Sequence, residues 1–136
     1  MDYLLKNRLE DMDFVKVTSL LTQAYWSLGI QYEEVVQVAR NSTLVVGAFT
    51  LDGAQIAYTR AVSDRLRFGY VADVIVDPEY RGQGLGKALL RYLLADPILE
   101  KVRHWLLVTR DAQELYKKIG FQVVARPLDW MEYRPF

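Results

Sequence analysis

Cysteine is absent from this chain of 136 residues, and histidine occurs once. The lack of cysteine excludes disulfides, thiol nucleophiles, CxxC redox pairs and thiolate zinc sites. Because His104 is the only histidine, a multi-histidine metal centre cannot form, and a Ser/His/Asp triad would have to use this residue. The set of available catalytic groups is therefore small, and we expect no metal.

An excess of charge and long apolar runs are also absent. The chain has 17 Lys+Arg and 17 Asp+Glu, so it has no overall field that would attract nucleic acid or an anionic membrane surface. No stretch approaches the roughly 18 apolar residues of a membrane span, and the first residues carry charges. We expect a cytoplasmic protein without a nucleic-acid or membrane partner, and the sequence leaves a homodimer open.

Repeats, low-complexity tracts and Gly/Ser linkers are missing as well, which favours a single domain over residues 1–136. Apolar residues at helical spacing predict a helix over 13–24, with Asp13 as its cap, and a shorter helix over 32–39. The glycine and large aromatic residues of 25–30 predict a loop between them.

β-branched and aromatic residues predict the next elements. Two strands, over 43–51 and 55–63, flank an Asp-Gly turn and should pair as a hairpin. A third run, 68–76, is too continuously apolar for a sheet edge, so we place it centrally, with Pro78 ending it.

The second half of the chain alternates strands and helices. We expect a helix from Leu85 to Asp96-Pro97, a strand over 105–109, a helix over 112–119 between an Asp111 cap and Gly120, and strands over 121–124 and 131–133. This order predicts an α/β or α+β fold with a mixed sheet.

The segment between the third strand and its following helix is rich in glycine. Free N–H groups at a helix start, together with the helix dipole, suit an anion such as a pyrophosphate. The dinucleotide fingerprint GxGxxG fails in both frames, because Lys87 and Leu89 stand where its third glycine belongs. A Walker A loop fails too, with Arg81 at its first glycine and Ala88 at its Ser/Thr.

The pattern that does match is Arg-x-x-Gly-x-Gly, carried by Arg81, Gly84 and Gly86. It resembles the acetyl-CoA pyrophosphate loop of the GNAT superfamily of N-acyltransferases. A second family motif, Ala-x-x-Leu-Tyr-x-x-x-Gly-Phe, is similar to residues 112–121. The resemblance spans Leu20 to Trp130 and is closest to small bacterial members of undefined substrate. One departure is Thr109, where the family often has an asparagine that contacts the cofactor.

The resemblance implies a three-layer GNAT-like fold, in which helices flank a mixed, mostly antiparallel central sheet. It also implies that acetyl-CoA is the co-substrate, with its pantetheine arm lying beside the third strand like an added strand. The cofactor-binding residues that it implies are Val74, Ile75, Val76, Arg81, Gly82, Gln83, Gly84, Leu85, Gly86, Lys87, Thr109 and Asp111. Because no cysteine can carry an acetyl group, the transfer should be direct.

Two residues are candidates for proton transfer. The resemblance implies that Tyr116 is the general acid, since a phenol of pKa ~10 can return a proton to the departing thiolate; a packed core tyrosine is the alternative. Asp73 is the only carboxylate of the third strand and the candidate base; the alternative is a structural carboxylate bonded to backbone amides. Strand alternation puts Asp73 on the face opposite Tyr70, and a bulge would change this.

The acceptor site is predicted from aromatic residues where the family has its variable pocket. We expect Tyr25, Trp26, Tyr70 and Trp130 to form its wall, although the loop residues and Trp130 would also serve as ordinary core. This wall favours a small-molecule amine with an apolar or aromatic body, with a peptide N-terminus as an alternative. A non-catalytic acyl-CoA-binding module is the rival to an N-acetyltransferase.

Overall fold

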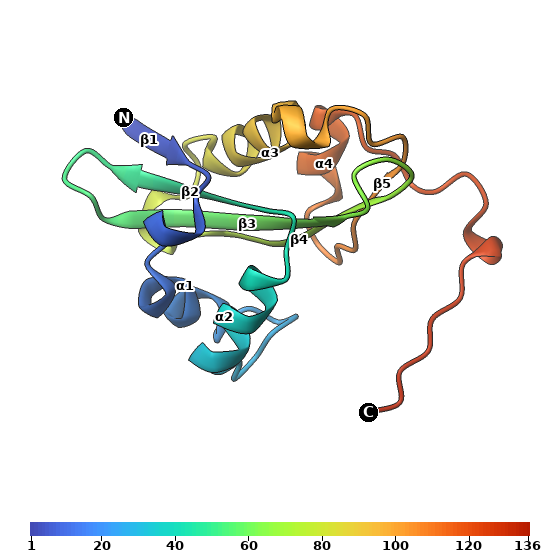
Figure 1. Cartoon of the computed structure of the whole chain (residues 1–136), viewed down its shortest axis with the longest axis horizontal. Helices are drawn as coiled ribbons and strands as arrows, with labels where there is room; N and C mark the ends of the chain where they lie inside the picture. Colours follow the sequence, from blue (N-terminus) through green and yellow to red (C-terminus); the bar gives the residue numbers. More distant parts are fainter.

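The computed structural model describes all 136 residues, with helices on both faces of a mixed sheet (Figure 1). The strands lie in the order β1-β2-β3-β4-β5; the first four run antiparallel and β5 runs parallel to β4. The strands are β1 (Tyr3–Lys6), β2 (Leu44–Thr50), β3 (Gln55–Ser63), β4 (Gly69–Val76) and β5 (Trp105–Leu106), and the helices are α1 (Phe14–Leu21), α2 (Tyr32–Arg40), α3 (Leu85–Ala95) and α4 (Gln113–Ile119).

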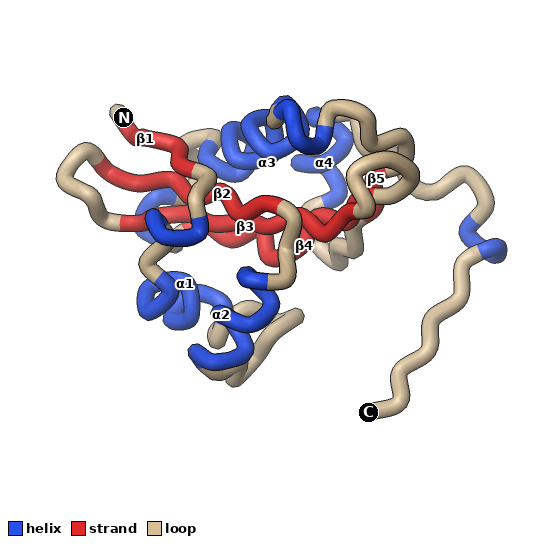
Figure 2. Tube along the Cα trace, in the orientation of Figure 1, coloured by secondary structure: helices blue, strands red, loops and turns tan.

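The helices form the outer two of three layers. α1 and α2 cover one face of the sheet, and α3 and α4 cover the other (Figure 2). Each face has its own buried core: Tyr58 and Ile75 pack on the side of α1 and α2, whereas Ile56 and Val71 pack on the side of α3. This arrangement confirms the predicted fold class.

Most predicted helices and strands are present, with ends that shift by a few residues. The Asp13 carboxylate accepts a hydrogen bond from the Lys16 N–H at 3.1 Å, which confirms the cap, but α1 ends at Leu21 and not at Ala24. Gly120 ends α4 with a φ of 115°, as expected. None of the helices is both long and apolar enough to cross a membrane.

The third predicted strand, β4, lies between β3 and β5 and is therefore not the last strand of the sheet, as expected, although β3 is the middle strand. β4 pairs with β5 only at Gly69 and Tyr70, so most of β4 has an open outer edge. Trp105 packs over Gly69, where an added Cβ would lie 2.6 Å from the indole ring. After this contact the strands part, and the strand predicted over 105–109 is reduced to β5.

The two ends of the chain also differ from the prediction. β1 was not predicted, because four residues that end on Lys6 give too short a pattern, yet it pairs along β2. The strands predicted over 121–124 and 131–133 are absent, since neither segment pairs with a neighbour. Residues 126–136, the C-terminal segment, leave the body of the molecule (Figure 1). A strand needs a partner for its backbone groups, whatever its composition.

Candidate active site

Residues 81–87, which we call the glycine turn, follow β4 and include the first turn of α3. Gly82 and Gly84 have φ angles of 80° and 79°, in the left-handed region that glycine adopts without steric cost. None of the N–H groups from Gly82 to Lys87 has an acceptor within the chain. Because these groups lie at the positive end of the α3 dipole, they can bind an anion.

A partly buried ion pair holds the chain just before the glycine turn. The Asp77 carboxylate accepts hydrogen bonds from Lys16 Nζ of α1 at 2.6 Å and from the Glu79 N–H at 2.9 Å. The hydrogen bond from Lys16 holds the pKa of Asp77 below its usual value, and Asp77 in turn raises the pKa of Lys16. At the same strand end, Arg81 Nε donates to the carbonyl oxygen of Val76 at 3.3 Å. The turn is therefore held by contacts outside itself.

The open edge of β4 lies directly before this turn. An extended ligand can add to such an edge through backbone hydrogen bonds, as a further strand would. The side chains of Val74 and Val76 pack toward α3, and Ile75 packs toward α1 and α2. Their side chains are therefore part of the core, so the ligand contact that the resemblance implies would fall to their backbone groups.

Tyr116 of α4 is 9% exposed and belongs to the core on the α3 side. The edge of the Phe121 ring meets it at 6.0 Å between centroids. Burial, with smaller contributions from Tyr25 and Asp111, raises the pKa of the Tyr116 hydroxyl to about 12. The hydroxyl therefore stays protonated at physiological pH and can donate a hydrogen bond.

The start of α4 differs from the prediction. Asp111 is not the cap; the Thr109 hydroxyl accepts the hydrogen bond from the Ala112 N–H at 3.1 Å. Ala112 occupies the cap position itself and has no acceptor on its side chain, so the bond comes from further upstream. The Thr109 oxygen is thus already engaged in holding α4.

A bulge in β4 changes which way Asp73 points. The register between β3 and β4 shifts opposite Thr59, and Asp73 has a φ of 56°. Val71 and Val74 consequently both pack toward α3, although simple alternation would put them on opposite faces. The bulge places Asp73 on the face of α1 and α2, which by alternation is also the face of Tyr70.

Asp73 is held by two side chains on this face. Arg60 Nε of β3 donates to Oδ2 at 2.8 Å, and Trp26 Nε1 donates to Oδ1 at 3.0 Å. Arg60 also donates to the Ser42 hydroxyl at 3.3 Å. The Asp73 side chain is 10% exposed. Its partners are side chains, whereas the structural alternative predicted from the sequence had backbone amides.

Tyr25 connects the same loop to the start of α4. Its hydroxyl accepts the Arg110 N–H at 2.9 Å, and the Arg110 guanidinium lies 4.5 Å from the centroid of the Tyr25 ring. The rings of Tyr25 and Trp26 meet edge to face at 5.1 Å. Residues 25–30, which we call the aromatic loop, therefore extend from the bulge of β4 toward the surroundings of Tyr116.

Trp130 contacts neither Tyr25 nor Trp26, so the structure does not bring it together with the rest of the predicted acceptor wall. Its ring contacts His104 at 5.8 Å, at the beginning of the 104–110 segment, whereas Tyr25 contacts Arg110 at the other end. Trp130 lies apart because the C-terminal segment leaves the sheet.

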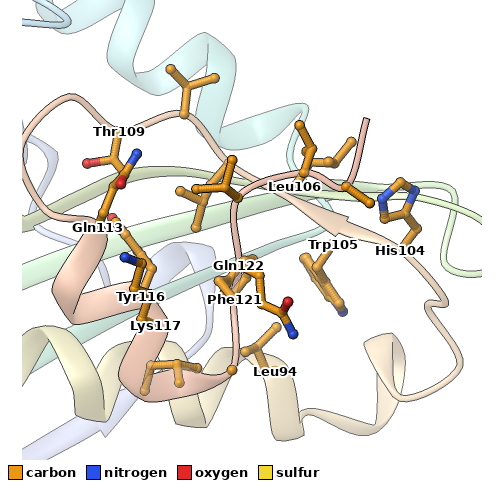
Figure 3. A pocket seen from close by; sticks show the side chains of 17 residues that line it. Leu94, His104, Trp105, Leu106, Thr109, Gln113, Tyr116, Lys117, Phe121 and Gln122 are labelled. Carbon is orange, nitrogen blue, oxygen red and sulfur yellow. The ribbon is translucent and has the colours of Figure 1, made fainter. Parts of the chain in front are cut away.

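A groove of about 760 Å³ opens beside α4 (Figure 3). Its walls are residues 104–109, α4 and residues 119–125, and it is largely apolar. Figure 3 shows Tyr116 and Lys117 on one side of this α4 groove and Trp105 on the other, with Leu94 of α3 at its base.

Sequence reasoning missed Lys16 and Arg110. Lys16 and its partner Asp77 are 61 positions apart, and the Tyr25–Arg110 contact joins residues 85 positions apart. No local motif signals contacts at such separations. No group of three or more His, Asp or Glu side chains could hold a metal ion.

These features can be compared with known proteins. A family model for the "Acetyltransferase (GNAT) domain" matches residues 32–123. The chain belongs to the GNAT family of acetyltransferases. A Xanthomonas campestris pv. campestris protein assigned to the same family has a TM-score of 0.89 and 34% identity, covering 98% of this chain and 94% of that one.

Other similarities are more distant. The glucosamine 6-phosphate N-acetyltransferase of Trypanosoma brucei brucei is 27% identical over 135 residues, covering 88% of this chain and 90% of that protein. A predicted acetyltransferase from Clostridium acetobutylicum, solved with acetyl-CoA, shares the fold with a TM-score of 0.73 and 19% identity, over 98% of this chain and 96% of that one. The GNAT chain spans about a third of the length of the first curated relatives that it matches, acetyltransferases from Glycine max and Arabidopsis thaliana.

Proposed function

We propose that this GNAT protein is an acetyl-CoA-dependent N-acetyltransferase that transfers acetyl directly to a primary amine of a small molecule. The observation that carries the proposal is the run of unpaired N–H groups from Gly82 to Lys87 at the start of α3. A pyrophosphate would satisfy these groups, and the open edge of β4 would pair with the pantetheine arm. The family membership supports the same co-substrate.

The transfer step follows from the groups around β4. The neutral amine attacks the thioester carbonyl carbon, the carbonyl oxygen takes up the negative charge, and backbone N–H groups of β4 stabilise it. The C–S bond then breaks, and the CoA sulfur leaves as a thiolate. We assign Tyr116 as the donor to this sulfur. With a pKa of about 12, its hydroxyl acts first as a hydrogen-bond donor to the developing charge.

We assign Asp73 the role of positioning the aromatic loop. The proton of the attacking amine passes to water, and no side chain is assigned to accept it. Both Asp73 oxygens already accept N–H groups, from Arg60 and Trp26. These contacts attach the loop to β4 and support its role in the acceptor site.

The acceptor proposal rests on Tyr25 and Trp26, whose rings are both partly exposed. An apolar or aromatic amine would bury surface against them at about 25 cal/mol per Å². The similarity to a glucosamine 6-phosphate N-acetyltransferase makes an amino sugar phosphate the competing acceptor class.

The test has two stages. Isothermal titration with CoA establishes binding, and release of free thiol from acetyl-CoA is then measured over a panel of aromatic amines, peptides, spermidine and glucosamine 6-phosphate. We expect turnover, fastest with the aromatic amines. Binding without turnover on any acceptor would favour a non-catalytic acyl-CoA-binding module. Preference for spermidine or the sugar phosphate would contradict the apolar acceptor.

A further inference from the structure

Arg110 lies between the aromatic loop and the start of α4, and its position is fixed from two sides. Its backbone N–H donates to the Tyr25 hydroxyl at 2.9 Å, and its guanidinium lies over the Tyr25 ring, 4.5 Å from the centroid. A guanidinium that stacks on an aromatic ring loses rotational freedom but keeps its N–H donors. The Arg110 side chain is therefore positioned without its hydrogen bonds being used.

The charge of Arg110 is also unpaired. Its guanidinium donates no hydrogen bond and forms no ion pair, although two carboxylates lie close to it in the sequence. Asp111 forms no ion pair either, and Glu114 pairs with a lysine of its own helix at 3.5 Å. The other guanidinium at the aromatic loop, that of Arg60, is bonded to Asp73 at 2.8 Å. The loop thus has one cation that no group of the chain neutralises.

This cation lies close to the groups of the proposed transfer step. Arg110 stands two residues before Ala112, whose carbonyl oxygen accepts the Tyr116 N–H at 3.4 Å. On its other side, the centroids of the Tyr25 and Trp26 rings are 5.1 Å apart, and both side chains are partly exposed. One small molecule can therefore contact the guanidinium and the Trp26 ring together.

We propose that the Arg110 guanidinium binds an oxyanion of the acceptor, either a carboxylate or a phosphate. The inference rests on the proposed function and narrows its acceptor class to amines that have an apolar or aromatic body and an anionic group. The paired N–H groups of a guanidinium match two oxygens of either anion, and such charge-assisted hydrogen bonds give specificity. With the anion at Arg110 and the body against Trp26, the amine is free to approach the acetyl group.

The first test compares acceptors that differ in charge. Thiol release from acetyl-CoA is measured with para-aminomethylbenzoate against its carboxamide, which tests a carboxylate, and with tyramine phosphate against tyramine, which tests a phosphate. We expect the anionic member of at least one pair to have a kcat/KM at least about 10-fold higher than its neutral partner. Arg110→Gln should abolish this preference, and Arg110→Lys, which keeps the charge, should retain part of it.

The matched control for the first test is Arg91→Gln, at an exposed arginine of α3 that also forms no ion pair; it should keep the preference. Equal use of the neutral acceptor in both pairs, or a preference that survives Arg110→Gln, would overturn the inference. A loss of CoA affinity in Arg110→Gln would do the same, because it would place the guanidinium on the cofactor. Absence of turnover with every amine would instead contradict the proposed N-acetyltransferase.

The second test measures binding without turnover. The chain has three tryptophans, and Trp26→Phe identifies which indole N–H signal in a proton–nitrogen NMR spectrum belongs to Trp26. Phenylacetate and phenyl phosphate have a ring and an anion but no amine, so they cannot be acetylated. In the presence of CoA, we expect at least one of them to shift the Trp26 signal saturably, with an affinity at least about 10-fold weaker in Arg110→Gln. Neutral phenylacetamide should bind as weakly to both proteins.

This second result separates the inference from the proposed function. A shift that depends on Arg110 would support the oxyanion site even if no amine were turned over. No shift with either anion, or equal affinities in the wild type and Arg110→Gln, would overturn the oxyanion site even if the protein acetylated an amine.

Discussion

The glycine turn and the aromatic loop adjoin the same strand, β4, but they use different chemical groups. The turn offers backbone N–H groups that have no partner in the chain. In the aromatic loop the polar side-chain groups are bonded already: Trp26 to Asp73, and Tyr25 to Arg110. The turn therefore has the unpaired donors that the proposed anion site needs, whereas the proposed role of the loop in acceptor binding depends on its shape.

This difference explains why the backbone conformation of the glycine turn could be predicted from the sequence, whereas that of the aromatic loop could not. A backbone site depends on local conformation, which Gly82 and Gly84 impose by themselves, so a short motif carries it. The loop depends on Asp73, which lies 47 positions after Trp26 and reaches it only through a bulge. A bulge was considered from the sequence, but its position was not predictable, because nothing local distinguishes it.

The largest expected effect is on the glycine turn. Gly84→Asp introduces a carboxylate beside the proposed pyrophosphate site and should abolish CoA binding, lowering affinity at least about 100-fold. Gly53→Asp, in the β2–β3 turn, is the matched control: both glycines have positive φ and no atom within 4 Å of an added Cβ, so the strain is comparable. Titration calorimetry measures the affinity of both folded variants for CoA. Equal affinity for CoA would place the site elsewhere.

Tyr116 belongs to the core cluster that also contains Leu85, and its hydroxyl should matter for the chemical step alone. Tyr116→Phe should keep CoA affinity and lower kcat by roughly 10- to 1000-fold. Because the pKa of Tyr116 is about 12, the wild-type profile of kcat should show no loss from its ionisation up to about pH 11. Steady-state thiol release checks both. An unchanged kcat would leave Tyr116 as a core residue.

A smaller effect is expected at the aromatic loop. Trp26→Phe replaces the indole by a smaller aromatic ring and removes the hydrogen bond to Asp73, so KM for the acceptor should rise about 2- to 10-fold while CoA affinity stays constant. Asp73→Asn should likewise affect KM more than kcat and preserve the acid limb of the pH profile. If instead kcat falls by about 100-fold or more and that limb disappears, Asp73 is the base.

The smallest effect tests the core on the α1 and α2 side of the sheet. The Tyr58 hydroxyl is buried without a hydrogen-bond partner, so Tyr58→Phe should stabilise the fold by about 1 kcal/mol or leave it unchanged. Burial raises the pKa of Tyr58, so the wild-type free energy of unfolding should fall above about pH 10, where the unfolded chain ionises and the folded one does not. Urea titrations at pH 7 and 10.5 should show less alkaline loss in the variant; an equal loss would contradict this.

The limits of sequence reasoning follow the same physical division. Helix starts such as Asp13 and the β2–β3 hairpin depend on neighbours in the chain and were predicted. The strand expected over 121–124 needs a partner strand from elsewhere in the chain and does not form. Trp130 lies beyond this segment and contacts His104. The single domain, the cytoplasmic location and the absence of nucleic-acid or membrane partners stay predictions.

The most direct test of the backbone anion site is to observe its N–H groups. Amide proton and nitrogen chemical shifts would be recorded on adding CoA and, separately, pantetheine, which lacks the pyrophosphate. We predict that the amides from Gly82 to Lys87 shift strongly with CoA and little with pantetheine, while β4 amides respond to both. If CoA binds and these amides do not shift, the glycine turn is not the pyrophosphate site.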